Sequence, residues 1–287
     1  MTLITGANGH LGTATLQSFK TSNPDKPIAG MVRSPEKGEQ IKKLGAGVRI
    51  GDYQKPETLT DAFDGITTLL LISSSTFEYR VQQHKNVIEA AANAGVHRIF
   101  YTSMLQANKE LSPLAKDHSE TEKALRASGI PFTIFRHTFY TEFLPMFFGG
   151  APDSGKWIFP SGGQPVTLAY RTDMAEALAN ALADPSKHEG KIYEISTNTS
   201  HTLKNLAEVL GNELGNEITY VDPPIDDFVG ELKKAGLPDE VVSMSRLSAQ
   251  TVVNGALGHT SSHLEQLLGR PQKSMEQFIR DFARQNT

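Results

Sequence analysis

Cysteine is absent from this 287-residue chain. Disulfides, thiolate nucleophiles and cysteine-ligated metals are therefore excluded. A basic excess is also lacking, because the formal net charge is -4, which argues against nucleic-acid binding. No apolar run approaches the ~20 residues of a membrane span, and the chain begins with an expected strand in place of a signal peptide. These absences predict a cytoplasmic protein that binds neither nucleic acid nor membrane. No metal site is expected, since the histidines are scattered along the chain.

The first half of the sequence alternates short apolar runs with segments of helical pattern. Strands are expected at residues 3–4, 27–32, 47–50, 67–72, 98–102 and 132–136. Helices are expected between them, at residues 11–20, 35–44, 56–63, 79–93 and 115–127. Nearly continuous apolar strands separated by amphipathic helices predict a parallel sheet covered on both faces. The fold class is therefore α/β, with a doubly wound parallel Rossmann sheet over residues 1–138.

The pattern changes after residue 138, where an aromatic-rich stretch leads into a loop rich in glycine, proline and serine. Further elements are expected as helices at 171–183, 203–214, 225–235 and 275–284 and as strands at 191–195 and 217–221. No polar linker separates them from the first half. Residues 139–287 are therefore predicted to form a smaller α/β substrate lobe, partly interleaved with the Rossmann sheet.

A glycine-rich segment lies between the first expected strand and the first expected helix. It reads Thr5-Gly6-Ala7-Asn8-Gly9-His10-Leu11-Gly12. Glycines three apart allow a tight turn, and the amides and dipole of the following helix favour a pyrophosphate. The segment predicts dinucleotide binding by Gly6, Ala7, Asn8, Gly9, His10 and Leu11. An ordinary glycine-rich turn is the alternative.

The residues after the second and third strands bear on the choice of cofactor. An NAD site normally has a carboxylate after the second strand, whereas this chain has Arg33. A guanidinium can pair with a 2′-phosphate, so Arg33 favours NADPH, with a solvated surface arginine as the alternative. Asp52 after the third strand is placed to accept a hydrogen bond from adenine, or it is a turn aspartate. Small hydroxyl residues at later strand ends, Ser73, Ser74, Ser75 and Thr102, are expected along the dinucleotide.

Taken together, these motifs resemble the NmrA-like branch of the atypical short-chain dehydrogenases. Within that branch the nearer likeness is to the bacterial type 2 NADPH-dependent quinone oxidoreductases and the triphenylmethane reductases. The likeness covers nearly the whole length and rests on residues 5–12, 32–35, 69–75, 84–88, 118–123 and 129–136. It implies a doubly wound NADP-binding domain, a smaller substrate lobe, and hydride transfer from NADPH to a flat aromatic or quinonoid acceptor.

One departure concerns proton transfer. Ordinary short-chain dehydrogenases use a Tyr-x-x-x-Lys pair, and this sequence contains none. The stretch that matches the catalytic lysine of isoflavone-reductase-like relatives holds His118, which we expect to have a near-neutral pKa and to protonate a quinol oxygen. Tyr140 and His137 follow the sixth strand and are the other catalytic candidates. Each of the three has a structural alternative, as a surface helix histidine or as packing residues.

Seven large side chains follow the sixth strand and could form a lid for a flat acceptor, or an ordinary core. They are Phe139, Phe143, Met146, Phe147, Phe148, Trp157 and Phe159. The leading hypothesis is an NADPH-dependent oxidoreductase that acts on quinones or similar conjugated acceptors. The alternative is a non-catalytic NADP(H)-binding redox sensor of NmrA type, favoured by the missing Tyr-x-x-x-Lys pair. A sugar-nucleotide epimerase ranks last, because it needs that pair. A homodimer is left open.

Overall fold

The computed structural model describes residues 1–286 and has a seven-stranded parallel sheet at its centre. The strand order is β3-β2-β1-β4-β5-β6-β9, the doubly wound arrangement with one added edge strand. The strands are β1 (Thr2–Ile4), β2 (Ile28–Val32), β3 (Gly47–Ile50), β4 (Thr68–Leu71), β5 (Arg98–Met104), β6 (Phe132–His137) and β9 (Ile192–Ile195). The six strands expected in the first half are all present, and the predicted Rossmann sheet is confirmed.

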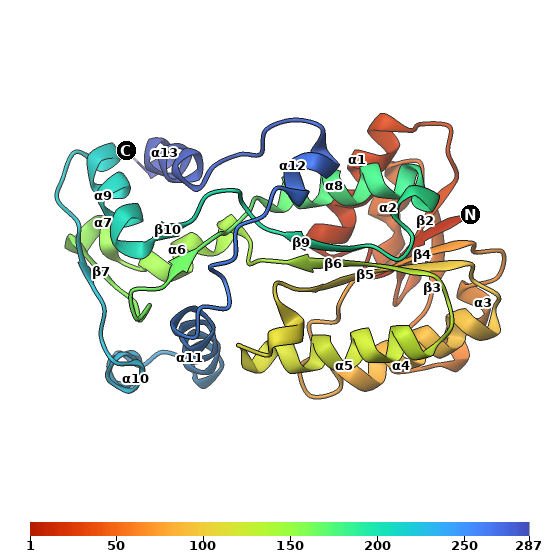
Figure 1. Ribbon diagram of the computed structural model, residues 1–287, viewed down its shortest axis with the longest axis horizontal. Coiled ribbons are helices and arrows are strands. Elements are labelled where there is room, and N and C mark those ends of the chain that lie inside the picture. The colour runs from red at the N-terminus through yellow and green to blue at the C-terminus, as the bar shows by residue number, and fades with distance from the viewer. Residues whose placement is uncertain (287) are drawn as a thin grey trace.

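Helices cover both faces of this sheet (Figure 1). One face carries α1 (His10–Ser22), α2 (Glu39–Lys43), α8 (Arg171–Ala183) and α12 (His263–Leu268). The other carries α3 (Glu57–Ala62), α4 (Arg80–Asn93) and α5 (Pro113–Ala127). Every residue of β2 and β4 is buried, which explains why these strands contain almost no polar side chains. Short 3-10 helices at η1 (Pro35–Gly38), η2 (Ala107–Lys109), η3 (Thr141–Phe143) and η4 (Pro185–His188) join the larger elements.

The remaining elements form a lobe beside the carboxyl ends of the strands, at the left of Figure 1. Its helices are α6 (Leu144–Phe148), α7 (Ala151–Ser154), α9 (Leu203–Leu214), α10 (Ile225–Lys234), α11 (Asp239–Val253) and α13 (Met275–Asn286). Two small sheets complete it, β7 (Lys156–Ile158) with β11 (Thr219–Val221) and β8 (Pro165–Val166) with β10 (His201–Thr202). The lobe has its own apolar core.

Four helices, α6, α7, α11 and α12, are not predicted by the sequence patterns above. In α11 the buried face includes hydroxyl residues, which interrupts the apolar periodicity. The hydroxyl of Thr251 is satisfied inside the fold: it donates to the Leu247 carbonyl at 2.8 Å and also lies 2.8 Å from the hydroxyl of Ser112. A polar position can therefore belong to a buried face when its partners come from elsewhere in the chain.

Candidate functional site

The loop between β1 and α1 is shaped by its glycines. Gly6 has a φ of +59°, which a side chain would strain. A Cβ at Gly12 would lie 2.5 Å from the Gly6 carbonyl oxygen and 2.8 Å from the Ala7 Cα. Because both obstructing atoms are backbone, only glycine allows α1 to begin this close to the loop. The loop at residues 5–12, called the cradle below, therefore depends for its shape on glycine at positions 6 and 12.

The start of α1 leaves amides available at this cradle. Gly9 is the N-cap, with no side-chain cap, and the first helical hydrogen bond runs from Thr13 N to Gly9 O at 2.9 Å. Within residues 1–286, the amides of His10, Leu11 and Gly12 have no protein partner. Free amides at a helix N-terminus suit a phosphate. The side chains of Ala7 and Leu11 are buried, so these two residues can contact a ligand only through their backbone.

Tyr53 ties three strand ends together underneath the cradle. Its hydroxyl hydrogen-bonds to the Thr5 hydroxyl and to the Ile72 carbonyl, the latter at 3.0 Å. Thr5 in turn bonds the Leu70 carbonyl at 3.0 Å and accepts from Ile72 N at 3.1 Å. Burial raises the pKa of the Tyr53 phenol. Tyr53 therefore holds the edge of the sheet in shape.

Arg33 and Asp52 lie at the next two strand ends. Arg33 follows β2, is exposed, and has no hydrogen bond or ion pair within residues 1–286. Its guanidinium is therefore free to meet an anion. Asp52 is half-buried, and one of its carboxylate oxygens accepts from Gln54 N at 3.0 Å. One oxygen of Asp52 is thus used in a turn, which was the alternative expectation, and its second oxygen remains available to a ligand.

The residues after β4 are held from below by neighbouring elements. Ser73 N donates to the Thr102 hydroxyl at 2.9 Å, and Ser74 N donates to His84 Nε2 at 2.9 Å. Thr102 is buried, so it supports this edge from inside the sheet. The side chains of Ser73 and Ser74 are half-buried and that of Ser75 is exposed. A dinucleotide passing over this edge would meet small side chains on a fixed backbone.

His118 differs from the expectation for a near-neutral acid. It is buried on α5, and its Nδ1 lies 2.8 Å from the Tyr101 hydroxyl. Burial, together with the positive charge of Arg80, holds the pKa of His118 well below its usual value. The predicted near-neutral pKa is therefore wrong, because the imidazole lies inside the fold and not on a helix surface. It is a neutral ring at pH 7.

The two candidates at and just beyond the end of β6 have different surroundings. His137 is buried, its Nε2 has no hydrogen-bond partner, and burial lowers its pKa to about 3. It lies near enough to His118 to affect the pKa of that ring. Tyr140 lies instead against Arg171, whose guanidinium carbon is 4.5 Å from the ring centroid. Burial raises the pKa of Tyr140 to about 12, so its hydroxyl stays protonated at neutral pH.

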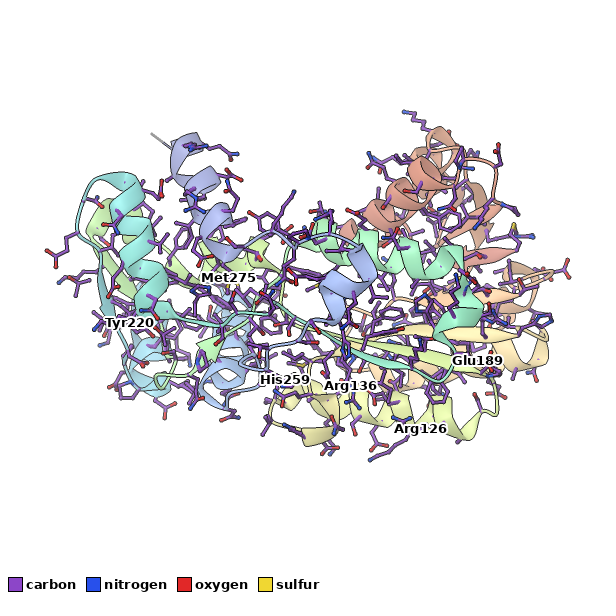
Figure 2. All side chains as sticks on the ribbon, turned by 45° about the horizontal axis from the view of Figure 1, so that its top comes forward. Arg126, Arg136, Glu189, Tyr220, His259 and Met275 are labelled. Atoms are coloured by element: carbon purple, nitrogen blue, oxygen red, sulfur yellow. The ribbon has the colours of Figure 1, made fainter. Side chains whose placement is uncertain are left out.

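A buried ion-pair cluster at the ends of β5, β6 and β9 was not predicted. Arg136 donates from Nε and Nη2 to the two oxygens of Glu122 at 2.9 and 2.7 Å, and from Nη1 to Glu194 at 2.8 Å. Ser103, Arg136 and Glu194 lie directly opposite one another on the three strands. Figure 2 shows Arg136 between the sheet and α5, beside the lobe. An arginine inside an apolar strand was the only sequence signal for it.

The aromatic stretch is mostly the core of the lobe. Phe147, Phe148, Trp157 and Phe159 are at most 3% exposed. Phe147 stacks on Phe159 with ring centroids 4.6 Å apart, and Phe148 meets Trp157 edge to face at 5.4 Å. These four residues cannot form a lid, because they are sealed inside the lobe. Only Phe139, Phe143 and Met146 remain partly or fully exposed.

Two further features have no part in this site. Surface grooves of about 530 and 760 Å³ lie between α4 and α5 and beside α9 and β11, and no predicted site residue lines either one. His259 and His263 are four residues apart, a spacing typical of metal ligands, but α12 begins only at His263, whose Nδ1 accepts from Glu194 N at 3.1 Å. No cluster of three metal-ligating side chains occurs within residues 1–286, and none of the helices there could cross a membrane.

Known proteins resemble this chain over its full length. The model of the NmrA-like family matches residues 1–276. Quinone oxidoreductase 2 of Escherichia coli (strain K12) is 37% identical over 279 residues, which are 97% of each chain. The structure of an NADPH-dependent quinone oxidoreductase from Escherichia coli complexed with NADPH superimposes with a TM-score of 0.93 and covers 98% of this chain and 99% of its own.

A second solved structure extends the likeness. The triphenylmethane reductase of Citrobacter sp. complexed with NADP(H) has a TM-score of 0.92 and 30% identity, and the match covers 99% of this chain and 100% of that one. Each of these relatives matches the cradle half and the lobe together, so the likeness is not confined to a dinucleotide-binding domain. The chain belongs to the NmrA-like family.

Proposed function

We propose that this protein is an NADPH-dependent oxidoreductase that transfers hydride to a quinone or a similar conjugated aromatic acceptor. The observation that carries this proposal is the full-length match, at 37% identity, to a quinone oxidoreductase. The cradle adds support of its own, since a Cβ at Gly12 would close it. NADPH supplies the hydride when it is bound.

The residues of the chain bind and orient the two reactants. In this proposal Gly6, Ala7, Asn8, Gly9, His10 and Leu11 hold the pyrophosphate, and Arg33 pairs with the 2′-phosphate. Asp52 accepts from adenine, and the edge formed by Ser73, Ser74, Ser75 and Thr102 supports the dinucleotide. His118, His137 and Tyr140 lie at the acceptor end. Residues 1–138 thus act as the cofactor domain and residues 139–287 as a substrate lobe that is partly interleaved with the Rossmann sheet, in a cytoplasmic enzyme.

A proton must follow the hydride to the reduced acceptor. The chain has no Tyr-x-x-x-Lys pair, and His118 and His137 are neutral at pH 7. A quinol anion is stable enough to take its proton from water. Quinones therefore suit this site better than alcohols or ketones, whose alkoxides need an acid close by.

The test is oxidation of NADPH by the purified protein with benzoquinone and with a triarylmethane dye, followed by absorbance, with NADH in parallel. Turnover with either acceptor, faster with NADPH than with NADH, is the expected result. Binding of NADPH by calorimetry without turnover of any acceptor in a panel would instead favour the redox sensor. The missing Tyr-x-x-x-Lys pair is the observation behind that second candidate. Sedimentation of the same sample would decide whether the protein is a homodimer.

A further inference from the structure

A network of buried polar side chains lies between α4, β5 and α5, next to the proposed acceptor end. Its first member, His84, has a defined tautomer. The amide of Ser74 can only donate, and it donates to His84 Nε2 at 2.9 Å. The proton of the neutral ring is therefore on Nδ1, which lies 2.9 Å from the Thr121 hydroxyl. Burial and Arg80 lower the pKa of His84 to about 3, so the ring stays neutral.

Tyr101 is the central member of this network. It is fully buried on β5, so it cannot touch a ligand. Its hydroxyl lies 2.8 Å from His118 Nδ1. The hydroxyl of Thr121 already donates to the Asp117 carbonyl at 2.9 Å, so it has no proton to give to Tyr101. The phenol gives its own proton either to His118 Nδ1 or to a neighbouring hydroxyl, and we take His118 as the acceptor.

Arg80 makes this region electropositive. It is 5% exposed, donates from Nε to the Ser74 carbonyl at 2.9 Å, and lies 3.6 Å from Asp117. Its charge lowers the pKa of both His84 and His118. The titratable groups around His118 are Arg80 and His84 on α4, Tyr101 on β5, His137 at the end of β6, and Asp117 and Glu122 on α5. The carboxylates of Asp117 and Glu122 are paired with Arg80 and Arg136.

The other nitrogen of His118 is left for a ligand. With Nδ1 accepting from Tyr101, the ring proton is on Nε2. Within residues 1–286 no protein group bonds to Nε2, and the residue keeps 9% of its surface exposed. The ring lies beside Tyr101 of β5 and near enough to His137, at the end of β6, for that residue to affect its pKa.

We propose that Tyr101, backed by Arg80, is a positioning residue that fixes His118 as a neutral ring with its proton on Nε2, aimed at the acceptor oxygen. This inference rests on the proposed function. During hydride transfer the acceptor gains a hydride and becomes an oxyanion. The Nε2–H of His118 donates a hydrogen bond to that oxygen and keeps its proton. Water then protonates the anion and leaves hydroxide.

The test compares Tyr101→Phe with a matched control, Tyr193→Phe. Tyr193 also places its hydroxyl 2.8 Å from a histidine Nδ1, that of His188, but it lies on β9 away from the cofactor edge. Nitrogen-15 NMR of the ring nitrogens of His118 reads the tautomer without any substrate. We expect one Nε2–H tautomer between pH 5.5 and 8 in the wild type and in Tyr193→Phe, and a mixture of tautomers in Tyr101→Phe.

Kinetics give the second readout. In Tyr101→Phe the kcat for benzoquinone should fall about tenfold, less than the ~10²-fold effect of removing such a donor outright. The Kd for NADPH should not change, and Tyr193→Phe should keep its kcat. In Arg80→Met the pKa of His118 should rise, and in Arg80→Lys, which keeps the positive charge, it should stay as in the wild type.

The outcomes separate this inference from the proposed function. A wild type with an Nδ1–H or protonated His118 at pH 7, or a Tyr101→Phe variant with an unchanged tautomer, would overturn the inference whatever the enzyme does. Absence of turnover in the wild type, with the tautomer fixed by Tyr101, would reject the quinone reductase and leave the positioning of His118 standing.

Discussion

The two ends of the sheet's carboxyl edge are built in different ways. At β1 and β2 the edge is made of backbone: glycines without room for a Cβ, free amides, and a buried tyrosine that ties the loops from below. At β5, β6 and β9 it is made of side chains, with Arg136, Glu122 and Glu194 in one cluster and two neutral histidines beside it. A fixed backbone suits a ligand of constant shape, whereas side chains at strand ends can be exchanged without a change of fold and so suit ligands that vary.

The largest loss of stability should come from a substitution in the ion-pair cluster of Arg136, Glu122 and Glu194. Arg136→Met leaves the carboxylates of Glu122 and Glu194, whose side chains are 4% and 17% exposed, without their shared cation. Loss of one partner of a buried ion pair costs about 3–5 kcal/mol of stability. Urea unfolding would measure it. Lys234→Met, which breaks an exposed pair with Glu231 on α10, should leave the midpoint unchanged.

Low pH should also destabilise the protein through this end of the sheet, because three buried histidines lie there. His84, His118 and His137 are buried and neutral, with lowered pKa values, two of them about 3. Unfolding restores their ordinary pKa near 6.5. Below that pH the three histidines are therefore protonated in the unfolded chain but not in the folded chain. Stability is complete above about pH 6.5 and should fall as the pH drops, by up to about 1.4 kcal/mol per pH unit for each histidine.

Urea midpoints at pH 7, 6 and 5 would measure this dependence. His137→Gln should reduce the pH slope by about one proton, and His97→Gln, at an exposed position on the far side of the sheet, should leave it as it is. A wild-type stability that does not change over this range would contradict the neutral state of the three rings.

The backbone end should be sensitive to a single methyl group. Gly12→Ala drives a Cβ to 2.5 Å from the Gly6 carbonyl, so the loop must shift. We expect a loss of about 1–3 kcal/mol of stability and a weaker NADPH titration by calorimetry. Gly230→Ala in α10, where nothing lies within 4 Å of the new Cβ, is the control and should be neutral or slightly stabilising. Equal effects of the two substitutions would count against a shaped cradle.

An effect confined to cofactor affinity, with no loss of stability, should distinguish the two nicotinamide cofactors. Arg33→Glu removes one charge-assisted contact of about 1.5–3 kcal/mol, so NADPH affinity should fall about 10- to 150-fold with little change for NADH. Lys233→Glu on α10 makes the same charge change in the lobe and should affect neither cofactor. If Arg33→Glu weakens both cofactors equally, then Arg33 supports the loop and not the 2′-phosphate.

The contrast between the two ends also explains what the sequence could predict. The parallel sheet and the cradle depend on local patterns, namely apolar runs, helix periodicity and glycine spacing, and both were predicted closely. The partners of Arg136 lie 14 and 58 residues away along the chain, and those of His118 depend on which faces of α4 and β5 meet. Such partners follow from tertiary packing, so the sequence could place His118 near the site but not its ionisation state.

The order in which the chain visits the sheet has a consequence for synthesis. The chain leaves the sheet after β6, builds part of the lobe, and then returns with α8 and β9 before it builds the rest. Until residue 195 has left the ribosome, β6 is an uncovered edge strand, and such an edge readily pairs with other chains. A nascent chain stalled within residues 139–191 would therefore be the stage most prone to aggregation, even though its β1–α1 loop is already complete.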